Sequence, residues 1–165
     1  MTGERLDADW VRFWWKQADA SLNRLKELFL QTHGFLPGHN CVMLATDDSH
    51  RATGALVDLT PIPSDLTTLY WVISEAALPD ADSGYFIHSP ATVAGHFREY
   101  GPAPIDGESI ALVFAGDGGG CLFAIGDSGY IWKSATASWS DHFDIVAAGL
   151  QEFLEQLGRR IANQL

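Results

Sequence analysis

The chain contains few cysteines, and their spacing excludes one class of redox site. Only Cys41 and Cys121 occur in its 165 residues, and neither belongs to a Cys-x-x-Cys pair. Both lie inside apolar runs, so we expect two buried thiols that pack as small hydrophobic side chains. Such sparse use of cysteine is typical of a protein from a reducing compartment.

Long apolar runs are also missing. No apolar stretch approaches the roughly 20 residues of a membrane-spanning helix, and the polar, acidic N-terminus lacks the plan of a secretory signal. We therefore expect a cytoplasmic protein that does not enter a membrane. Hydrophobic residues make up 47% of the chain, which suits a globular core. The length fits one domain that spans residues 1–165.

Basic residues are scarce. Lysine and arginine total 10 against 21 aspartates and glutamates, which gives a net charge of −11. The imbalance is concentrated in residues 52–132, where ten acidic residues accompany only Arg98, for a net charge of −9. Such a surface repels phosphate backbones, which argues against nucleic-acid binding, and it attracts a basic partner. Ordinary solubility accounts for the same charge equally well.

Several motifs that carry chemistry are incomplete. No Lys, Ser or Thr follows the glycine run at residues 118–120, so the run lacks the features of a phosphate loop. The neighbouring acidic residues lack the Asp-x-Asp-x-Asp-Gly spacing of a calcium loop. The sequence GDSG at residues 126–129 lacks the Gly-x-Ser-x-Gly spacing of a nucleophile elbow. We expect turns at both places and no cofactor or metal.

Histidine keeps an enzymatic alternative open. His33 and His39 flank a short loop and are candidates to share a metal, although the helix dipole explains His33 as simply. Ser89 lies between His88 and His96, and a base beside a hydroxyl is the minimum for nucleophilic catalysis. A helix cap explains Ser89 as well. The alternative function is therefore a small-molecule-binding or hydrolytic domain that uses His88 and His96.

The hydrophobic pattern predicts three helices with strands between them. Apolar side chains at helical spacing predict helices over residues 7–33, 90–100 and 144–163, with Gly34 ending the first. Apolar and β-branched runs predict strands over residues 41–46, 54–59, 66–74, 85–87, 110–115, 121–125 and 130–133. Residues 47–50 are expected to form a turn and residues 75–84 a polar loop. The order favours an α+β fold, in which an N-terminal, a middle and a C-terminal helix pack against a mostly antiparallel sheet.

Six tryptophans are candidates for the core or for a binding surface. Trp10, Phe13 and Trp14 belong to the apolar stripe predicted for the first helix. Trp71 lies in a predicted strand and is expected in the core. Trp139 has polar neighbours in the sequence, which favours a partly exposed anchor for a partner.

The second half of the chain resembles a known family. The sequence FAGDGGG at residues 114–120 precedes a second apolar run and a glycine turn, and VAAGLQEFL at residues 146–154 begins an amphipathic segment. Their order and spacing resemble the C-terminal half of the SUKH superfamily, the Smi/Knr-like proteins, over residues 85–157. The resemblance implies an α+β fold in which a meander of strands is closed by a helix.

The resemblance also implies a function. Many bacterial members of that family are immunity proteins that bind and neutralise a toxin, so we expect a non-enzymatic protein-binding domain whose partner is a basic toxin domain such as a nuclease. A regulatory scaffold module is a further alternative that the resemblance permits. The residues expected to bind the partner combine carboxylates with aromatic anchors: Asp80, Asp82, Asp106, Glu108, Asp117, Tyr130 and Trp139.

Overall fold

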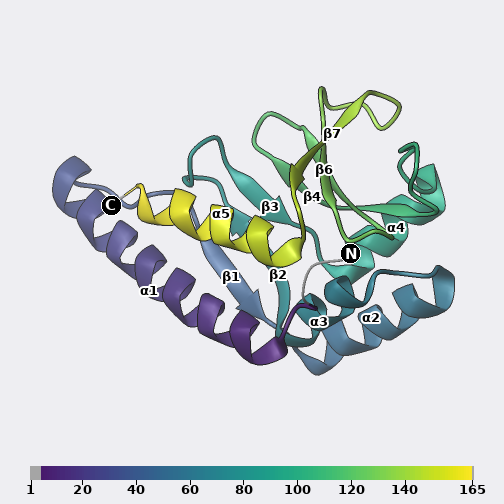
Figure 1. Cartoon of the computed structure of the whole chain (residues 1–165). Coiled ribbons are helices and arrows are strands. Elements are labelled where there is room, and N and C mark those ends of the chain that lie inside the picture. The colour runs from purple at the N-terminus through teal and green to yellow at the C-terminus, as the bar shows by residue number, and fades with distance from the viewer. Residues whose placement is uncertain (1–4, 165) are drawn as a thin grey trace.

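The computed structural model describes residues 5–164, and within them it contains a seven-stranded antiparallel sheet. The strands pair in chain order, so the sheet is a simple meander (Figure 1). The strands are β1 (Cys41–Leu44), β2 (Ile73–Leu78), β3 (Tyr85–Ile87), β4 (Ala111–Asp117), β5 (Leu122–Gly126), β6 (Ile131–Ser134) and β7 (Phe143–Ala147). The helices are α1 (Ala8–His33), α2 (Asp47–Leu59), α3 (Ser64–Val72), α4 (Pro90–Tyr100) and α5 (Leu150–Ala162). The predicted α+β class is confirmed.

Helix α1 has the ends and nearly the apolar stripe that the sequence predicts. The Asp7 side chain accepts a hydrogen bond at its start, and Gly34 ends it with φ 76° in the left-handed region that glycine favours. Its buried residues recur every three or four positions: Val11, Trp14, Ala18, Leu22 and Leu25. The prediction for Phe13 was wrong, because its side chain is 57% exposed and Val11 faces the core in its place.

The predicted turn at residues 47–50 and the strand at residues 54–59 are both wrong, because these residues form α2. Thr46 and Ser49 make a reciprocal capping box, in which each side chain accepts from the other's backbone N–H. Two aspartates in the first turn add favourable charge at the positive end of the helix dipole. This start signal explains why the segment is helical despite its short apolar run.

The strand predicted over residues 66–74 is also wrong, because α3 occupies residues 64–72. Leu66, Leu69 and Tyr70 are fully buried at helical spacing, so packing overrides the β-propensity of the segment. The polar loop predicted over residues 75–84 is wrong in its first part, because residues 75–78 belong to β2, where Ala76 and Leu78 pack in the core. Trp71, which was expected in the core, lies on the opposite side of α3 and is 57% exposed.

The final helix begins later than predicted. Residues 143–147 form the edge strand β7, and α5 starts only after Gly149. Ile145, which lies at the start of the helix predicted over residues 144–163, belongs to this strand and is 49% exposed. The remaining predicted stripe, including Phe153, Leu154 and Leu157, is buried as expected.

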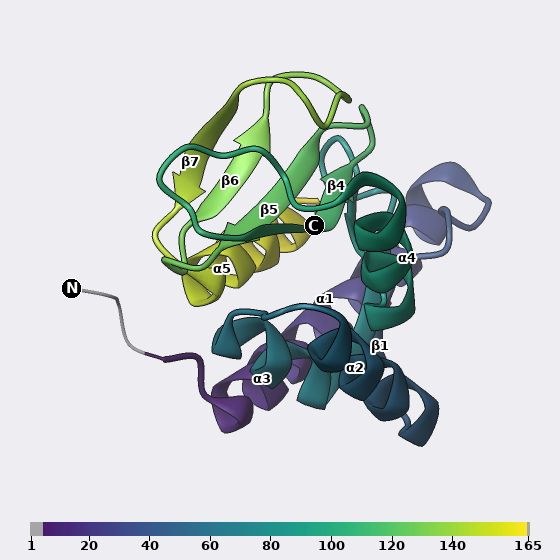
Figure 2. The ribbon, with the colours of Figure 1, turned by 90° about the vertical axis from the view of Figure 1, so that its right-hand side faces the viewer.

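The two faces of the sheet are covered differently. Alternate residues of β4, such as Leu112 and Phe114, point into the main core with α1 and α5. Their neighbours Ala111 and Val113 point to a smaller cluster on the other face, where Ile105 packs on them. Figure 2 shows the segment between α4 and β4 crossing this second face of the sheet. The segment therefore takes the place of a second helical layer there.

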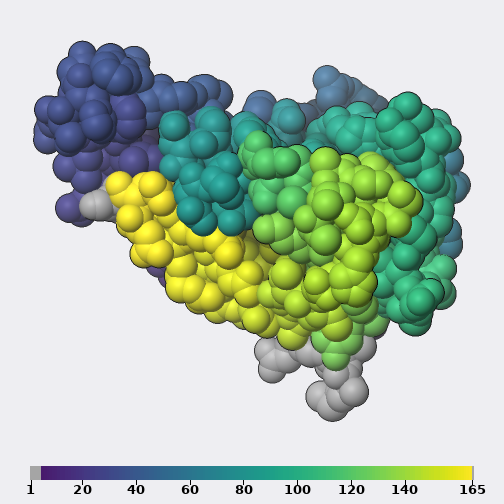
Figure 3. Space-filling model, turned by 90° about the horizontal axis from the view of Figure 1, so that it is seen from above, coloured from purple at the N-terminus to yellow at the C-terminus, as the bar shows by residue number. Residues whose placement is uncertain are grey.

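Helices α1 and α5 contact one another and form one layer. The indole N–H of Trp14 donates to the carbonyl of Leu154 over 2.7 Å, which ties the two helices together. The end of α1 and the loop after it project beyond the rest of the molecule (Figure 3). Among residues 5–164, no helix combines the length and the apolar character needed to cross a bilayer.

Candidate functional site

Asp117, at the end of β4, organises the glycine turn. One of its carboxylate oxygens accepts backbone N–H bonds from Gly119 and Cys121 at 3.0 and 2.9 Å, and the other lies 3.4 Å from the Nζ of Lys133. Its side chain is only 8% exposed. The three glycines of this turn have different roles. Gly120 has a positive φ of 87°, whereas a Cβ on Gly118 would overlap the carbonyl oxygen of Ser83.

Glu108 holds the crossing segment on the sheet. Its carboxylate accepts hydrogen bonds from the backbone N–H and hydroxyl of Ser128 at 3.1 and 2.6 Å, and from the indole N–H of Trp132 at 2.8 Å. A Cβ on Gly126 would overlap this carboxylate, so the glycine makes room for it. Glu108 was predicted to contact a partner, but its carboxylate accepts hydrogen bonds from this chain and so stabilises the fold.

Asp80 and Asp82 belong to the turn between β2 and β3. Asp80 accepts from the side-chain amide of Asn40 at 2.8 Å, and its own backbone N–H donates back to that side chain at 3.0 Å. Asp82 has a positive φ of 52° and lies 3.8 Å from the guanidinium of Arg160. Arg160 in turn lies over the ring of Tyr85. Asp80 therefore anchors the loop after α1, while Asp82 pairs with the last helix.

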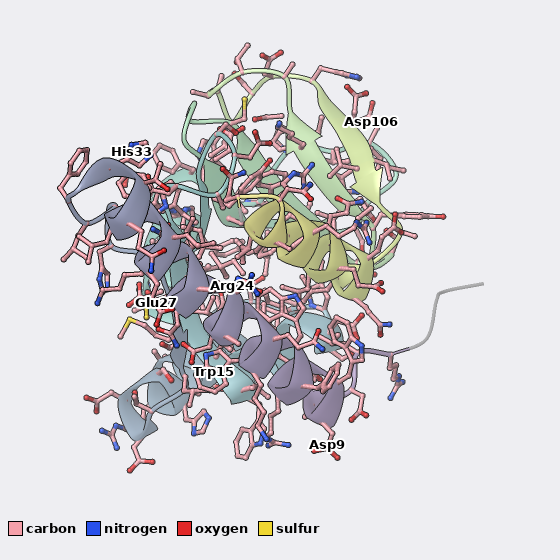
Figure 4. All side chains as sticks on the ribbon, turned by 90° about the vertical axis from the view of Figure 1, so that its left-hand side faces the viewer. Asp9, Trp15, Arg24, Glu27, His33 and Asp106 are labelled. Atoms are coloured by element: carbon pink, nitrogen blue, oxygen red, sulfur yellow. The ribbon has the colours of Figure 1, made fainter. Side chains whose placement is uncertain are left out.

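The structure divides the seven predicted residues between the two ends of the strands. The turns that contain Asp82 and Asp117 are neighbours, since the N–H of Gly118 donates to the carbonyl of Gly84. Asp106, Glu108 and Tyr130 lie at the opposite end, around the turn between β5 and β6. Asp106 and Tyr130 are exposed there. Figure 4 shows Asp106 far from His33 at the tip of α1.

Trp139 lies in the loop between β6 and β7, and it meets the histidines of the alternative function. Its ring is 5.0 Å from the ring of Tyr100 and 6.0 Å from that of His96, measured between centroids. The rings of His88 and His96 are 5.4 Å apart and nearly perpendicular. Ser89 is placed as the cap of α4, where its hydroxyl oxygen accepts from the N–H of Thr92.

The two imidazoles are poorly solvated. The Nδ1 atoms of both His88 and His96 are buried and have no hydrogen-bond partner. Burial, together with the neighbouring His96, lowers the pKa of His88 from 6.5 to about 4. His88 is therefore neutral at physiological pH, and its buried Nδ1 has no hydrogen-bond partner within residues 5–164. Among residues 5–164, no three His, Cys, Asp or Glu side chains gather in a way suited to a metal ion.

His33 and His39 do not share such a site either. The His33 ring packs between Phe29 and Phe35 at centroid distances of 4.3 and 5.9 Å, and His39 lines a polar hollow beside α1. The two cysteines are half-buried and free, so the expectation of two fully buried thiols was too strong. Burial raises the pKa of Cys41, with Asp19 and Glu75 adding to the effect.

Trp71, which the sequence predicts to lie in the core, is an exposed aromatic residue. Trp71 stacks on the imidazole of His50, with centroids 4.4 Å apart, and remains 57% exposed. The helical spacing of Leu66, Leu69 and Tyr70 was the available signal, because it places Trp71 off the buried face of α3. No protein-family model matches the chain, and no curated protein matches it.

Proposed function

We propose that this protein is a non-enzymatic, SUKH-type immunity protein that binds a basic toxin domain and blocks it. The distribution of charge in three dimensions carries the proposal. Helix α1 has four basic and three acidic side chains and α5 has two of each, so their layer has a net charge of +1. Because the whole chain is −11, the remainder carries −12.

Because of this asymmetry, a cationic partner is attracted more strongly to the rest of the surface than to the α1–α5 layer. Arg24 and Glu27 project from the open side of α1, where both signs are mixed (Figure 4). Elsewhere in residues 5–164, carboxylates outnumber basic groups fifteen to four. Such a field speeds the encounter with a basic protein and slows that with an acidic one. Negative charge that serves solubility alone does not need to be segregated in this way. The asymmetry therefore favours a role of the charge in binding.

The internal roles of several carboxylates limit which of them contact a partner. Asp80, Glu108 and Asp117 are already engaged in hydrogen bonds with this chain. They contribute to the long-range field, while exposed groups such as Asp106 remain free for direct contact. Of the predicted set, Asp82, Asp106, Tyr130 and Trp139 keep side-chain surface for contact, but they lie at both ends of the strands and do not form one binding surface.

The direct experiment uses the proteins encoded by the genes that flank this one. Each is co-expressed in a host with and without this protein, and growth and co-purification are measured. We expect one flanking product to be toxic, to be tolerated when this protein is present, and to co-purify with it. The proposal is wrong when no flanking product binds, or when the host survives equally well without this protein.

The converging imidazoles support a second candidate, a small-molecule-binding or hydrolytic domain. Two buried nitrogens without partners are unusual in a folded protein and mark a place where a polar ligand group gains hydrogen bonds. A nucleophile and a third, orienting group are needed for hydrolysis, and Ser89 is engaged as a cap. Esterase substrates tested against the wild-type protein and His88→Gln decide the hydrolytic form: equal background rates remove it.

A further inference from the structure

We infer that the partner docks on an exposed apolar patch centred on Trp71, where α2 and α3 meet the end of β1. This inference rests on the proposed function and identifies the surface that would bind the toxin. We call the residues Met43, Leu44, His50, Val57 and Trp71 the Trp71 patch. The apolar members are 47% exposed, and Trp71 is 57% exposed. Tryptophan is enriched among the anchor residues of protein interfaces, because it buries a large area at a small entropy cost.

The backbone fixes these residues as neighbours. Leu44 pairs with Ile73 in the sheet, and the N–H of Ala45 donates to the carbonyl of Val72 over 2.8 Å. These bonds bring the end of β1 beside the end of α3. Met43 and Leu44 are consecutive in β1, so their side chains lie on opposite sides of this edge strand and the patch continues around the edge. His50 then closes the patch, because its Nε2 lies 3.0 Å from the carbonyl oxygen of Trp71. Val57 extends the same face of α2 two turns beyond His50.

The ring position of Trp71 is held before any partner arrives. The His50 imidazole stacks on the indole at an interplanar angle of 15°, and the hydrogen bond to the Trp71 carbonyl fixes that imidazole. A preorganised aromatic side chain loses little freedom on binding, which favours affinity. Trp139, in contrast, packs against Tyr100 and the smaller cluster, so less of its surface remains for a partner.

The charges around the patch select a basic partner. Asp47 and Asp48 open α2, Asp58 lies near its end, and Glu75 is directly opposite Met43 in the register of β1 and β2. Of these, Asp48 pairs with Arg51. Within the described chain, Asp47, Asp58 and Glu75 have no ion-pair partner. Apolar anchors inside a rim of free carboxylates match a surface that combines apolar side chains with lysine or arginine.

Two other exposed apolar regions lack this complementarity. A hollow of about 400 Å³ between α1 and α5 exposes Phe13, but Glu155 and Arg159 line it with both signs. The tip of α1 exposes Phe35, and the neighbouring hollow is lined by Asp19 and Lys26, again one charge of each sign. Neither hollow therefore favours a basic partner electrostatically.

The test uses a short amphipathic peptide built only of leucine and lysine, with a leucine–glutamate peptide of the same pattern as its acidic twin. Backbone and indole chemical shifts are followed by NMR while peptide is added. We expect the lysine peptide to shift the Trp71 indole and the Met43 and Leu44 amides, and the acidic twin to leave them unchanged. Binding should weaken at least tenfold in Trp71→Ala, and less than twofold in Phe13→Ala, a control with the same 57% exposure.

Three results overturn the inference. The first is that the lysine peptide does not bind, and the second is that it changes the chemical shifts of residues in the α1–α5 hollow and not those of the Trp71 patch. The third is a dimer, seen by ultracentrifugation, that Trp71→Ala dissociates, because a second copy of the chain then occupies the patch. Unfolding curves confirm that both variants are folded. When a flanking toxin binds wild type and Trp71→Ala alike, the proposed function stands and this surface is wrong. When the peptide docks at Trp71 but no flanking product binds, the surface stands and the immunity function is wrong.

Discussion

At the scale of the residue, carboxylates in this chain divide into those that hold the fold and those that face solvent. Asp117 and Glu108 accept two and three hydrogen bonds, respectively, from groups of the same chain. Asp106 lies exposed only two positions before Glu108. Both kinds contribute equally to the net charge, but only the exposed carboxylates are available to contact a partner.

Replacing Asp117 should separate its structural role from its charge. Asp117→Ala removes the acceptor for the N–H groups of Gly119 and Cys121, and we expect it to lower the free energy of unfolding by about 1–3 kcal/mol. Asp117→Asn keeps an oxygen acceptor and should lose less than half as much. Urea unfolding of both variants measures this. Equal stability of Asp117→Ala and wild type would show that the turn does not depend on the carboxylate.

His88 should make stability depend on pH in acid. Its folded pKa of about 4 lies below its unfolded value near 6.5, so between these pH values the unfolded chain holds a proton that the folded chain lacks. The stabilising contribution is therefore complete above pH 6.5 and is lost as the pH falls through 4. We expect a loss of about 2–3 kcal/mol from this group.

Urea unfolding from pH 7 to pH 4 tests the role of His88. His88→Gln should flatten the part of the profile between pH 6.5 and pH 4. The matched control is His142→Gln, because the His142 side chain is 73% exposed and pairs only with Asp144. Should His88→Gln keep the wild-type slope, another group must be responsible for the pH dependence.

At the scale of the element, the sequence predicts a helix correctly where residues that begin and end helices are present. The predictions for α1 and α4 were confirmed because each combines a cap, a periodic stripe and a terminal glycine. The prediction for α3 was wrong because its side chains favour strands locally, and only their burial against other elements makes the helix. Strand β7 was missed because its outward Ile145 continues the helical spacing of α5 by coincidence.

The capping box of α2 offers a direct measure of one such signal. Thr46→Ala removes the side-chain oxygen that accepts from the N–H of Ser49, so we expect a loss of about 1 kcal/mol in unfolding free energy. Thr46→Ser keeps the oxygen and should stay within a few tenths of wild type. Thermal and urea unfolding provide the comparison. A loss of the same size in both variants would point to the methyl group and not to the cap.

At the scale of the whole molecule, sequence position proved a poor guide to surface position. The acidic segment 52–132 was expected to form a β-rich middle, but it also contains most of α2, together with α3 and α4. The predicted binding residues divide between opposite ends of the strands, because a meander sends successive turns to alternate ends. The sequence groups His88 with His96, and the structure places His88 just before α4 and His96 within it, with their rings 5.4 Å apart. The exposure of Trp71 follows only once this segment is read as a helix, because the spacing of Leu66, Leu69 and Tyr70 then places Trp71 off the buried face.

The charge asymmetry has a consequence for kinetics. A field that steers a basic partner acts before contact, so it changes the association rate more than the dissociation rate. Salt weakens it, because the Debye length falls from about 10 Å at 0.1 M to about 3 Å at 1 M. The apolar contact at the Trp71 patch is less sensitive to salt and should govern dissociation.

The most direct measurement is therefore the association rate constant of this protein with the flanking toxin, followed by stopped-flow as the salt concentration rises from about 0.05 to about 0.5 M. An acidic binding protein should associate at least tenfold more slowly at the higher salt, while dissociation changes little. An association rate that does not change with salt would contradict the account.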